Sequence, residues 1–336
     1  MDNFSNWIIS NATKFYCFSI ILSVPSILLY IGEMFAIVKN KETRANSFYR
    51  LFCVRGISDI LMMAASCYGN RLPSLLGPSL LPIYRALPNW ALALFYFLTT
   101  FTYQVTNIAT LFMLLNRFTA IAFPLSHKKI WKKFFWLLIM VMLAIPSLTC
   151  YPIMQMHATL SENADGTFLI MEPLRILLDY SNQLKSLTSI IFLILCFFVN
   201  LLTLIAYKRH RKANVTSQQS DNIERKLLIY SLLTFAGHAL LAVFFLSVSE
   251  FVWPFYPQYN AIIYIQYPWV TDLCTLVLSS WLLLCTSDKF RHQLIGTFLP
   301  KRLLASTRAQ NVVVPLDKNN VLITVQPYQS SKWAAR

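Results

Sequence analysis

The stretch Gln183–Tyr207, QLKSLTSIIFLILCFFVNLLTLIAY, is long and apolar enough to cross a lipid bilayer as one helix, which needs about 20 such residues. Six other stretches share this character: Tyr16–Val38, Ser47–Gly69, Trp90–Asn116, Phe134–Met154, Leu227–Val248 and Ile263–Cys285. Soluble proteins also bury apolar helices, but seven in succession are typical of a membrane protein. The sequence therefore predicts an all-α membrane protein, a bundle of seven transmembrane helices.

The charge distribution predicts how the bundle is oriented. The 336 residues are 56% hydrophobic and 13% charged, with a mean hydropathy of +0.52 and a net charge of +15. Of the 29 Lys and Arg, 22 fall in alternate connections and the tail: Lys39–Asn46, Arg117–Lys133, Lys208–Lys226 and Ser287–Arg336. Cytoplasmic segments carry this excess, so the N-terminus is predicted outside and the C-terminus inside. Membrane topology explains the basic charge, and no nucleic-acid partner is expected.

The chain divides into three parts around the bundle. Residues 1–15 are an extracellular tail with glycosylation sequons at Asn3 and Asn11, residues 16–285 hold the seven helices, and residues 286–336 are a cytoplasmic tail. Within that tail, the pattern at 287–299 predicts an amphipathic helix, with Phe290, Leu294 and Phe298 at helical spacing. The first apolar run is too long for a cleaved signal peptide. A multi-pass protein of the plasma membrane, in contact with the bilayer, is expected.

No motif points to an enzyme, a metal or a cofactor. The sequence has no HExxH, no GxSxG and no phosphate-binding loop. Its seven cysteines have no metal-ligand spacing and are typical of small core residues. A bridge between Cys67 and Cys150 near the outer face is open, because the sequence does not give its geometry.

Four ionisable residues inside the predicted helices form a candidate intramembrane network. Glu33 and Arg55 lie at similar depths, about 9 and 12 Å from the inner ends of their helices, so they are predicted to pair. Arg55 and Asp59 also share a helix face. Asp59 and Asp272 both fall near mid-membrane, where two acids close together can share a proton or a cation. The alternative, of equal weight, is a network that only fixes helix packing.

The outer half of the helices also contains a candidate ligand pocket. A lone buried histidine such as His238 more often packs than binds, and helical aromatics are more often core or interface residues. A wet pocket is nevertheless conceivable, and its candidate residues are Tyr96, Tyr103, Gln104, His238, Tyr264 and Gln266.

Motifs at the inner ends of the helices resemble those of rhodopsin-like G-protein-coupled receptors. The stretch Asn116–Leu125, NRFTAIAFPL, is similar to the DRY signature at the end of helix three, with Asn in place of the acid. Further matching positions are Asp59 in GISDILM, Trp136 with Pro146 ten residues on, and Phe290-Arg291. The sequence departs from the family at Ser279-Ser280, where NPxxY would begin, and it lacks the cysteines that join helix three to the second exterior loop.

The finer pattern resembles nematode serpentine chemoreceptors of the gamma superfamily, class V or class gamma. It is carried by NSFYRLFCVRGISDIL (46–61), NRLPS (70–74) and NRFTAIAFPLSHKKIW (116–131). The resemblance implies a receptor that binds an extracellular ligand in the outer half of the bundle and engages a heterotrimeric G protein inside.

On that resemblance, Asn116, Arg117 and Phe118 are the expected coupling residues. With Asn116 beside it, Arg117 has no neighbouring acid to hold it, and we expect it to project into water. The alternative is that Arg117 is only a topology charge. For the whole protein, the alternative function is a small-solute transporter or ion pathway that uses the buried carboxylates.

Overall fold

The computed structural model describes residues 7–8, 10–163, 166–174, 176–213, 218–247 and 260–298. The residues up to Leu294 belong to one compact unit, and the residues from Ile295 onward belong to a second. The arrangement below concerns the first unit.

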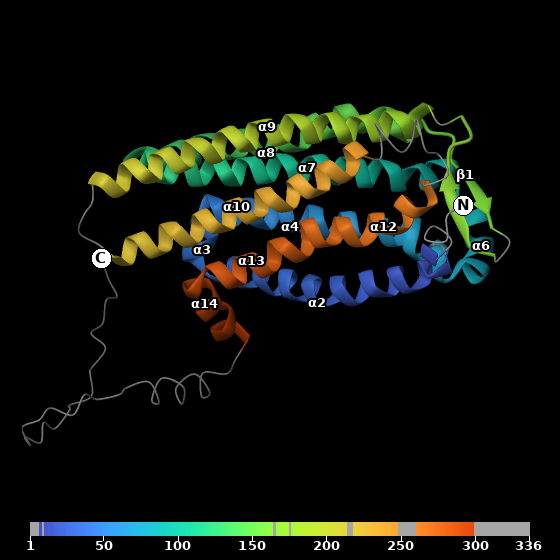
Figure 1. The fold of residues 1–336 in the computed structure, drawn as a ribbon, viewed down its shortest axis with the longest axis horizontal. Helices are drawn as coiled ribbons and strands as arrows, with labels where there is room; N and C mark the ends of the chain where they lie inside the picture. Colours follow the sequence, from blue (N-terminus) through green and yellow to red (C-terminus); the bar gives the residue numbers. More distant parts are fainter. Residues whose placement is uncertain are drawn as a thin grey trace, which may run out of the picture. The chain divides into compact units, whose positions relative to one another are not determined.

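Seven helices in the described part are long and apolar enough to span a membrane, so the predicted seven-helix bundle is confirmed (Figure 1). Two of these spans, the second and the seventh, each contain a π-helical turn. The seven spans, in chain order, are α2 (Ala12–Lys39); α4 (Ser47–Ser66) with η1 (Cys67–Arg71) and α5 (Leu72–Leu75); α7 (Asn89–Ala122); α8 (Pro124–Cys150) with η2 (Tyr151–Gln155); α9 (Ile176–Ala213); α10 (Gln218–Leu246); and α12 (Asn260–Asp272) with η5 (Leu273–Val277) and α13 (Leu278–Thr286).

The helices run further than the apolar stretches that predicted them. Most of the predicted basic connection Lys208–Lys226 belongs to the ends of α9 and α10, and residues 214–217 between them lie outside the described part. Hydropathy marks where a helix enters and leaves lipid, whereas the backbone hydrogen bonds continue into the polar residues beyond. The predicted positions of the spans are therefore right, and their lengths are too short.

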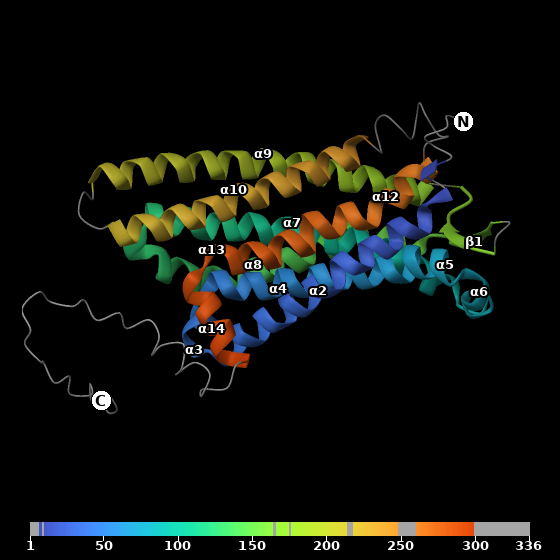
Figure 2. The same ribbon diagram turned by 60° about the horizontal axis from the view of Figure 1, so that its bottom comes forward.

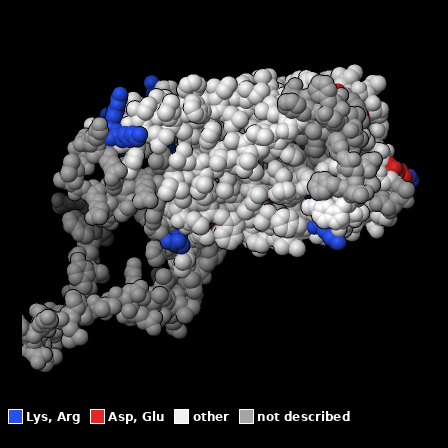
Figure 3. All heavy atoms as spheres, viewed as in Figure 1, with Lys and Arg blue, Asp and Glu red and all other residues white. Residues whose placement is uncertain are grey.

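Helix α7 lies at the centre of the bundle and packs against α4, α8 and α9. Small and hydroxyl-bearing residues let the helix backbones approach each other, as the hydrogen bond from Ser58 Oγ to the Thr102 carbonyl oxygen (3.0 Å) illustrates. Outward-facing positions are apolar and exposed, for example Leu148 (77% exposed) and Trp136 (67%) on α8. In Figure 3 the visible surface between the two ends of the described part carries almost no Lys, Arg, Asp or Glu. This is the surface expected of a bundle that faces lipid.

A small cap covers one end of the bundle, in two of the connections between the predicted spans. It consists of α6 (Gly77–Arg85) and an antiparallel hairpin of β1 (Thr159–Glu162) and β2 (Phe168–Met171), which lie at the same end in both ribbon views (Figures 1 and 2). Gly166 turns the hairpin with φ +80°. A Cβ on Gly77 would lie 2.7 Å from the Gly166 carbonyl oxygen, so α6 meets the turn only because residue 77 has no side chain.

Hydrogen bonds, and no disulfide, tie this cap to α7. All seven cysteines are free, so the open possibility of a Cys67–Cys150 bridge is not realised. The Asn89 side chain donates to the Met156 carbonyl oxygen (2.7 Å) and accepts from the Ala158 amide (2.8 Å). The connection between α8 and α9 is thereby held to the start of α7.

The opposite end of the bundle carries α3 (Lys41–Ala45) and the start of α14 (Asp288–Phe298), the predicted amphipathic helix. The Phe290 ring is 1% exposed and stacks on Tyr49 with ring centroids 5.6 Å apart. The Gln293 amide donates to the Ala36 carbonyl oxygen (3.1 Å) and to Thr43 Oγ1 (3.2 Å). These contacts confirm a helix at this position and dock its first turns on the ends of α2, α3 and α4.

Candidate functional site

Arg55 and Asp59 form a fully buried ion pair on α4. Nε of Arg55 lies 3.4 Å from a carboxylate oxygen of Asp59, and neither side chain is exposed. Asp59 also accepts hydrogen bonds from Thr106 on α7 (2.8 Å) and Tyr30 on α2 (3.3 Å). The pair therefore links α4 to both neighbouring helices.

His238 of α10 joins the same network. Its Nε2 atom lies 3.2 Å from Nη2 of Arg55 and 3.3 Å from Oγ1 of Thr110. A guanidinium group only donates, so Nε2 accepts and the neutral ring carries its proton on Nδ1. His238 was predicted as a pocket residue, and its observed contacts are with the polar network and with the ring of Phe192 (5.0 Å between centroids).

The predicted pair of Glu33 with Arg55 is wrong. Glu33 is 0% exposed, and neither of its carboxylate oxygens has a hydrogen-bond partner among the residues that the structure describes. The comparison of depths was a one-dimensional argument, and it did not fix which way each side chain turns around its helix. Asp59 is one turn from Arg55 on the same helix, and this local partner is the one that Arg55 contacts.

Arg71 and Asp272 form a second buried ion pair, between η1 and the end of α12. Nη2 of Arg71 donates to the Asp272 carboxylate and to Ser19 Oγ on α2 (2.8 Å). Asp272 also accepts from Ser19 (3.3 Å) and from Ser23. Arg71 follows the predicted span Ser47–Gly69, but it is 1% exposed and lies within the second span of the structure.

Asp59 and Asp272 are therefore not arranged to share a cation. Asp59 has Arg55 beside it and Asp272 has Arg71, so each carboxylate has its own counter-charge. Among the described residues, no group of three or more His, Cys, Asp or Glu side chains is placed to hold a metal ion. Buried acids paired in this way stabilise contacts between helices.

The predicted pocket residues that the structure describes contact partners on different elements. Tyr96 donates to the Ile170 carbonyl oxygen of β2 (2.6 Å), which joins α7 to the cap. Gln104 faces α8, where its amide reaches Cys150 Sγ (3.2 Å) and its oxygen accepts from Thr149 (3.0 Å). Gln266 accepts from the indole of Trp269 on the same helix. The side chain of Tyr264 lies outside the described residues.

Tyr103 belongs to a different cluster, which contains a lysine that the sequence analysis did not single out. The Tyr103 hydroxyl bonds Ser189 Oγ on α9 (2.6 Å), and its ring packs edge-on against Phe245 of α10 (4.8 Å). One turn before Ser189, Lys185 is 5% exposed. The sequence does contain a signal for Lys185, because a charged residue inside the apolar run Gln183–Tyr207 is unusual and often functional.

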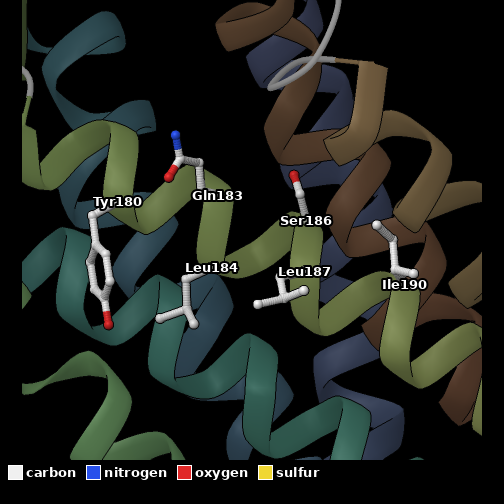
Figure 4. A pocket seen from close by; sticks show the side chains of 6 residues that line it. All are labelled: Tyr180, Gln183, Leu184, Ser186, Leu187 and Ile190. Atoms are coloured by element: carbon white, nitrogen blue, oxygen red, sulfur yellow. The ribbon is translucent and has the colours of Figure 1, made fainter.

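A separate hollow of about 330 Å³ lies along one face of α9. Figure 4 shows its six lining side chains on successive turns of that single helix: Tyr180, Gln183, Leu184, Ser186, Leu187 and Ile190. Leu187 and Ile190 are among the exposed apolar residues of the bundle surface, so this hollow is lined in part by lipid-facing side chains.

Arg117 lies near the C-terminal end of α7, away from the cap, and its guanidinium group packs against aromatic rings. Its guanidinium carbon lies 3.8 Å from the ring centroid of Phe48 on α4 and 5.5 Å from that of Tyr230 on α10. Its Nε atom is buried and has no hydrogen-bond partner. The expectation that Arg117 projects into water is therefore wrong. Beside it, Asn116 donates to Ser47 Oγ (2.8 Å).

Sequence comparison identifies the family to which this bundle belongs. Residues 16–294 match the profile of the Srg family of chemoreceptors. The chain belongs to the Srg family. This confirms the predicted family of nematode serpentine receptors, and with seven apolar helices the Srg protein is a multi-pass protein of the plasma membrane.

Three relatives of this Srg family member are serpentine receptors of class gamma from Caenorhabditis elegans. Class gamma-16 is 29% identical over 140 residues, which cover 40% of this chain and 42% of the relative. Class gamma-13 is 29% identical over 111 residues (32% and 33%), and class gamma-10 is 23% identical over 230 residues (66% and 69%). The chain thus spans less than half of the first two relatives.

Proposed function

We propose that this Srg family member is a chemosensory receptor that binds an extracellular ligand in the outer half of its bundle and signals through a heterotrimeric G protein. The N-terminus and the cap would lie outside, and the end with α3 and α14 would face the cytoplasm. Family membership and the alternation of Lys and Arg along the sequence support this orientation and function.

The observation that carries the proposal is the contact of Arg117 with Phe48 and Tyr230. It joins the predicted cytoplasmic ends of α4, α7 and α10, and no acid among the described side chains pairs with Arg117. A cation over an aromatic face contributes about 0.5–2 kcal/mol. A free energy of this magnitude can favour one arrangement of the three helices over another. A ligand that binds the other arrangement more tightly can then shift the equilibrium toward it.

In the resting packing, the charged face of Arg117 is covered by two rings. Movement of the end of α10 would withdraw Tyr230 and expose the guanidinium group to the cytoplasm. Asn116 holds its backbone segment in place through Ser47, so the arginine would be presented from a fixed helix end. We propose that Arg117, with its neighbours Asn116 and Phe118, then contacts the G protein.

A cell-based assay tests this function directly. Cells that express the full chain are exposed to pools of small molecules, and calcium and cAMP are recorded with and without the G-protein α subunits that the cells supply. A receptor gives a ligand-dependent signal that disappears when the α subunit is removed. Ligand uptake without any second-messenger signal would instead assign the chain as a transporter and overturn the proposal.

A further inference from the structure

Lys185 lies within α9, about 14 Å along the helix from its start at Ile176, at the end of the bundle that carries the cap. The residue is 5% exposed. Its Nζ atom lies 5.8 Å from the ring centroid of Phe245 on α10 and 5.8 Å from that of Tyr267 on α12. The ammonium group is thus enclosed between three helices.

This lysine differs from Arg55 and Arg71, the two arginines that are fully buried in the described part of the bundle. Arg55 and Arg71 each have an aspartate within ion-pairing distance. No carboxylate of a described residue lies within 4.0 Å of Lys185. Aromatic faces offset only part of the loss of hydration, so an unpaired ammonium group at this depth is costly unless an anion joins it.

The surroundings of Lys185 also have unused hydrogen-bonding capacity. The Tyr103 ring packs on Phe245, and its hydroxyl bonds Ser189, which in turn donates to the Lys185 carbonyl oxygen (2.6 Å). One turn from Tyr103 on α7, the amide of Asn107 is buried, and neither its nitrogen nor its oxygen makes a hydrogen bond of good geometry to a described residue. Buried amides are rarely left unpaired in the absence of water or a ligand.

We infer that Lys185 is the counter-ion for the carboxylate of a small ligand, whose apolar part packs on the rings of Phe245 and Tyr267. The inference rests on the proposed receptor function and specifies the ligand class. A carboxylate supplies the missing negative charge, and the two rings and Tyr103 supply apolar surface beside it. A neutral analogue of the same shape lacks the charge and binds far more weakly.

Thermal unfolding of the purified full-length receptor tests the inference without any G protein. Cys150, Cys196 and Cys274 are buried, so a thiol-reactive dye reports unfolding. The probes are straight-chain monocarboxylates from acetate to decanoate, each paired with its methyl ester. At least one acid is expected to raise the melting temperature by about 3 °C or more at saturation, while its ester does not.

Substitutions then assign the effect to Lys185. Lys185→Gln is expected to abolish the rise, and Lys185→Arg to retain it. Lys39→Gln is the matched control, because Lys39 also lies over an aromatic ring, that of Phe35 at 5.7 Å, but is exposed. If Lys185→Gln does not fold, the comparison of acid with ester in the unmodified receptor still tests whether the receptor binds a carboxylate.

Three results would overturn the inference: equal shifts with acid and ester, no shift with any acid, or a shift that survives Lys185→Gln. Because this readout is binding, its failure is separate from that of the receptor function. A G-protein signal without carboxylate binding removes only the ligand class, and carboxylate binding without a G-protein signal removes only the signalling role.

Discussion

Arg71 and Asp272 form a buried ion pair that joins the second membrane-spanning helix to the seventh, with Ser19 and Ser23 of the first helix completing the contact. Both charged residues adjoin π-helical turns, since Arg71 ends η1 and Asp272 directly precedes η5. A π turn adds one residue to a helical turn and so redirects the side chains beside it. The two irregular turns thus occur where a charged contact crosses the bundle.

Removing one partner of this pair should impair folding. Arg71→Gln or Asp272→Asn leaves the other charge buried and uncompensated, which costs about 3–5 kcal/mol in comparable buried pairs. We expect each single variant to reach the cell surface at a small fraction of the normal level, and the double variant to lose less than the two single losses combined. Arg85→Gln is the control. Its ion pair with Glu162 is 60% and 40% exposed at the two side chains, so its loss should change little.

A second double-mutant cycle separates the observed pair from the predicted one. Because Glu33 has no partner and Arg55 contacts Asp59, the effects of Glu33→Gln and Arg55→Gln should add to within about 0.5 kcal/mol. The cycle of Arg55→Gln with Asp59→Asn should show clear coupling. Thermal unfolding of the purified variants measures both, and coupling in the first cycle but not in the second would contradict the geometry.

Arg117→Ala should weaken signalling more than stability. The substitution removes a cation over two rings, about 0.5–2 kcal/mol, and leaves no buried charge without a partner, because Phe48 and Tyr230 are neutral. We expect near-normal surface expression and a strongly reduced G-protein response. Lys128→Ala, an exposed change in the same basic connection, should signal normally. Equal losses in the two variants would reduce Arg117 to a topology charge.

The orientation of the bundle can be tested with tags in intact cells. An epitope at the N-terminus should be labelled without permeabilisation, and one inserted after Asn311 only after permeabilisation. Glycosidase treatment should lower the apparent mass if Asn3 or Asn11 carries a glycan, and Asn3→Gln with Asn11→Gln should remove that shift. Labelling of both tags from one side would require an even number of crossings.

The sequence pattern predicts the bundle well because every span must be apolar and long enough to cross the bilayer. Each of the seven predicted spans coincides with a helix of the structure, and the helix that contains Phe290 was placed within a residue at each end. The cap was missed. Its hairpin is short and depends on contacts such as Gly77 against Gly166, which join residues far apart in the chain.

The contacts within the candidate site were less predictable, because they also depend on residues far apart in the chain. Depth along a helix follows from residue counting, but the direction of a side chain depends on how the helices pack. Arg55 and Asp59 were rightly expected to share a helix face, whereas the predicted pairing of Arg55 with Glu33 was wrong, and Arg71 was not predicted as a partner for Asp272. A search for a cation near Asp272 would have directed attention to Arg71, although Glu33 shows that a buried acid need not have a cationic partner.

The attachment of the cap through Asn89 has a consequence for how a ligand enters. A disulfide opens only by chemical reduction, whereas hydrogen bonds such as those from Asn89 to Met156 and Ala158 break and re-form through thermal motion. Dithiothreitol should therefore leave the response of the receptor unchanged. We expect opening at this end to be an equilibrium governed by temperature and ligand concentration, and the sensitivity of the receptor to be independent of the redox state of the surroundings.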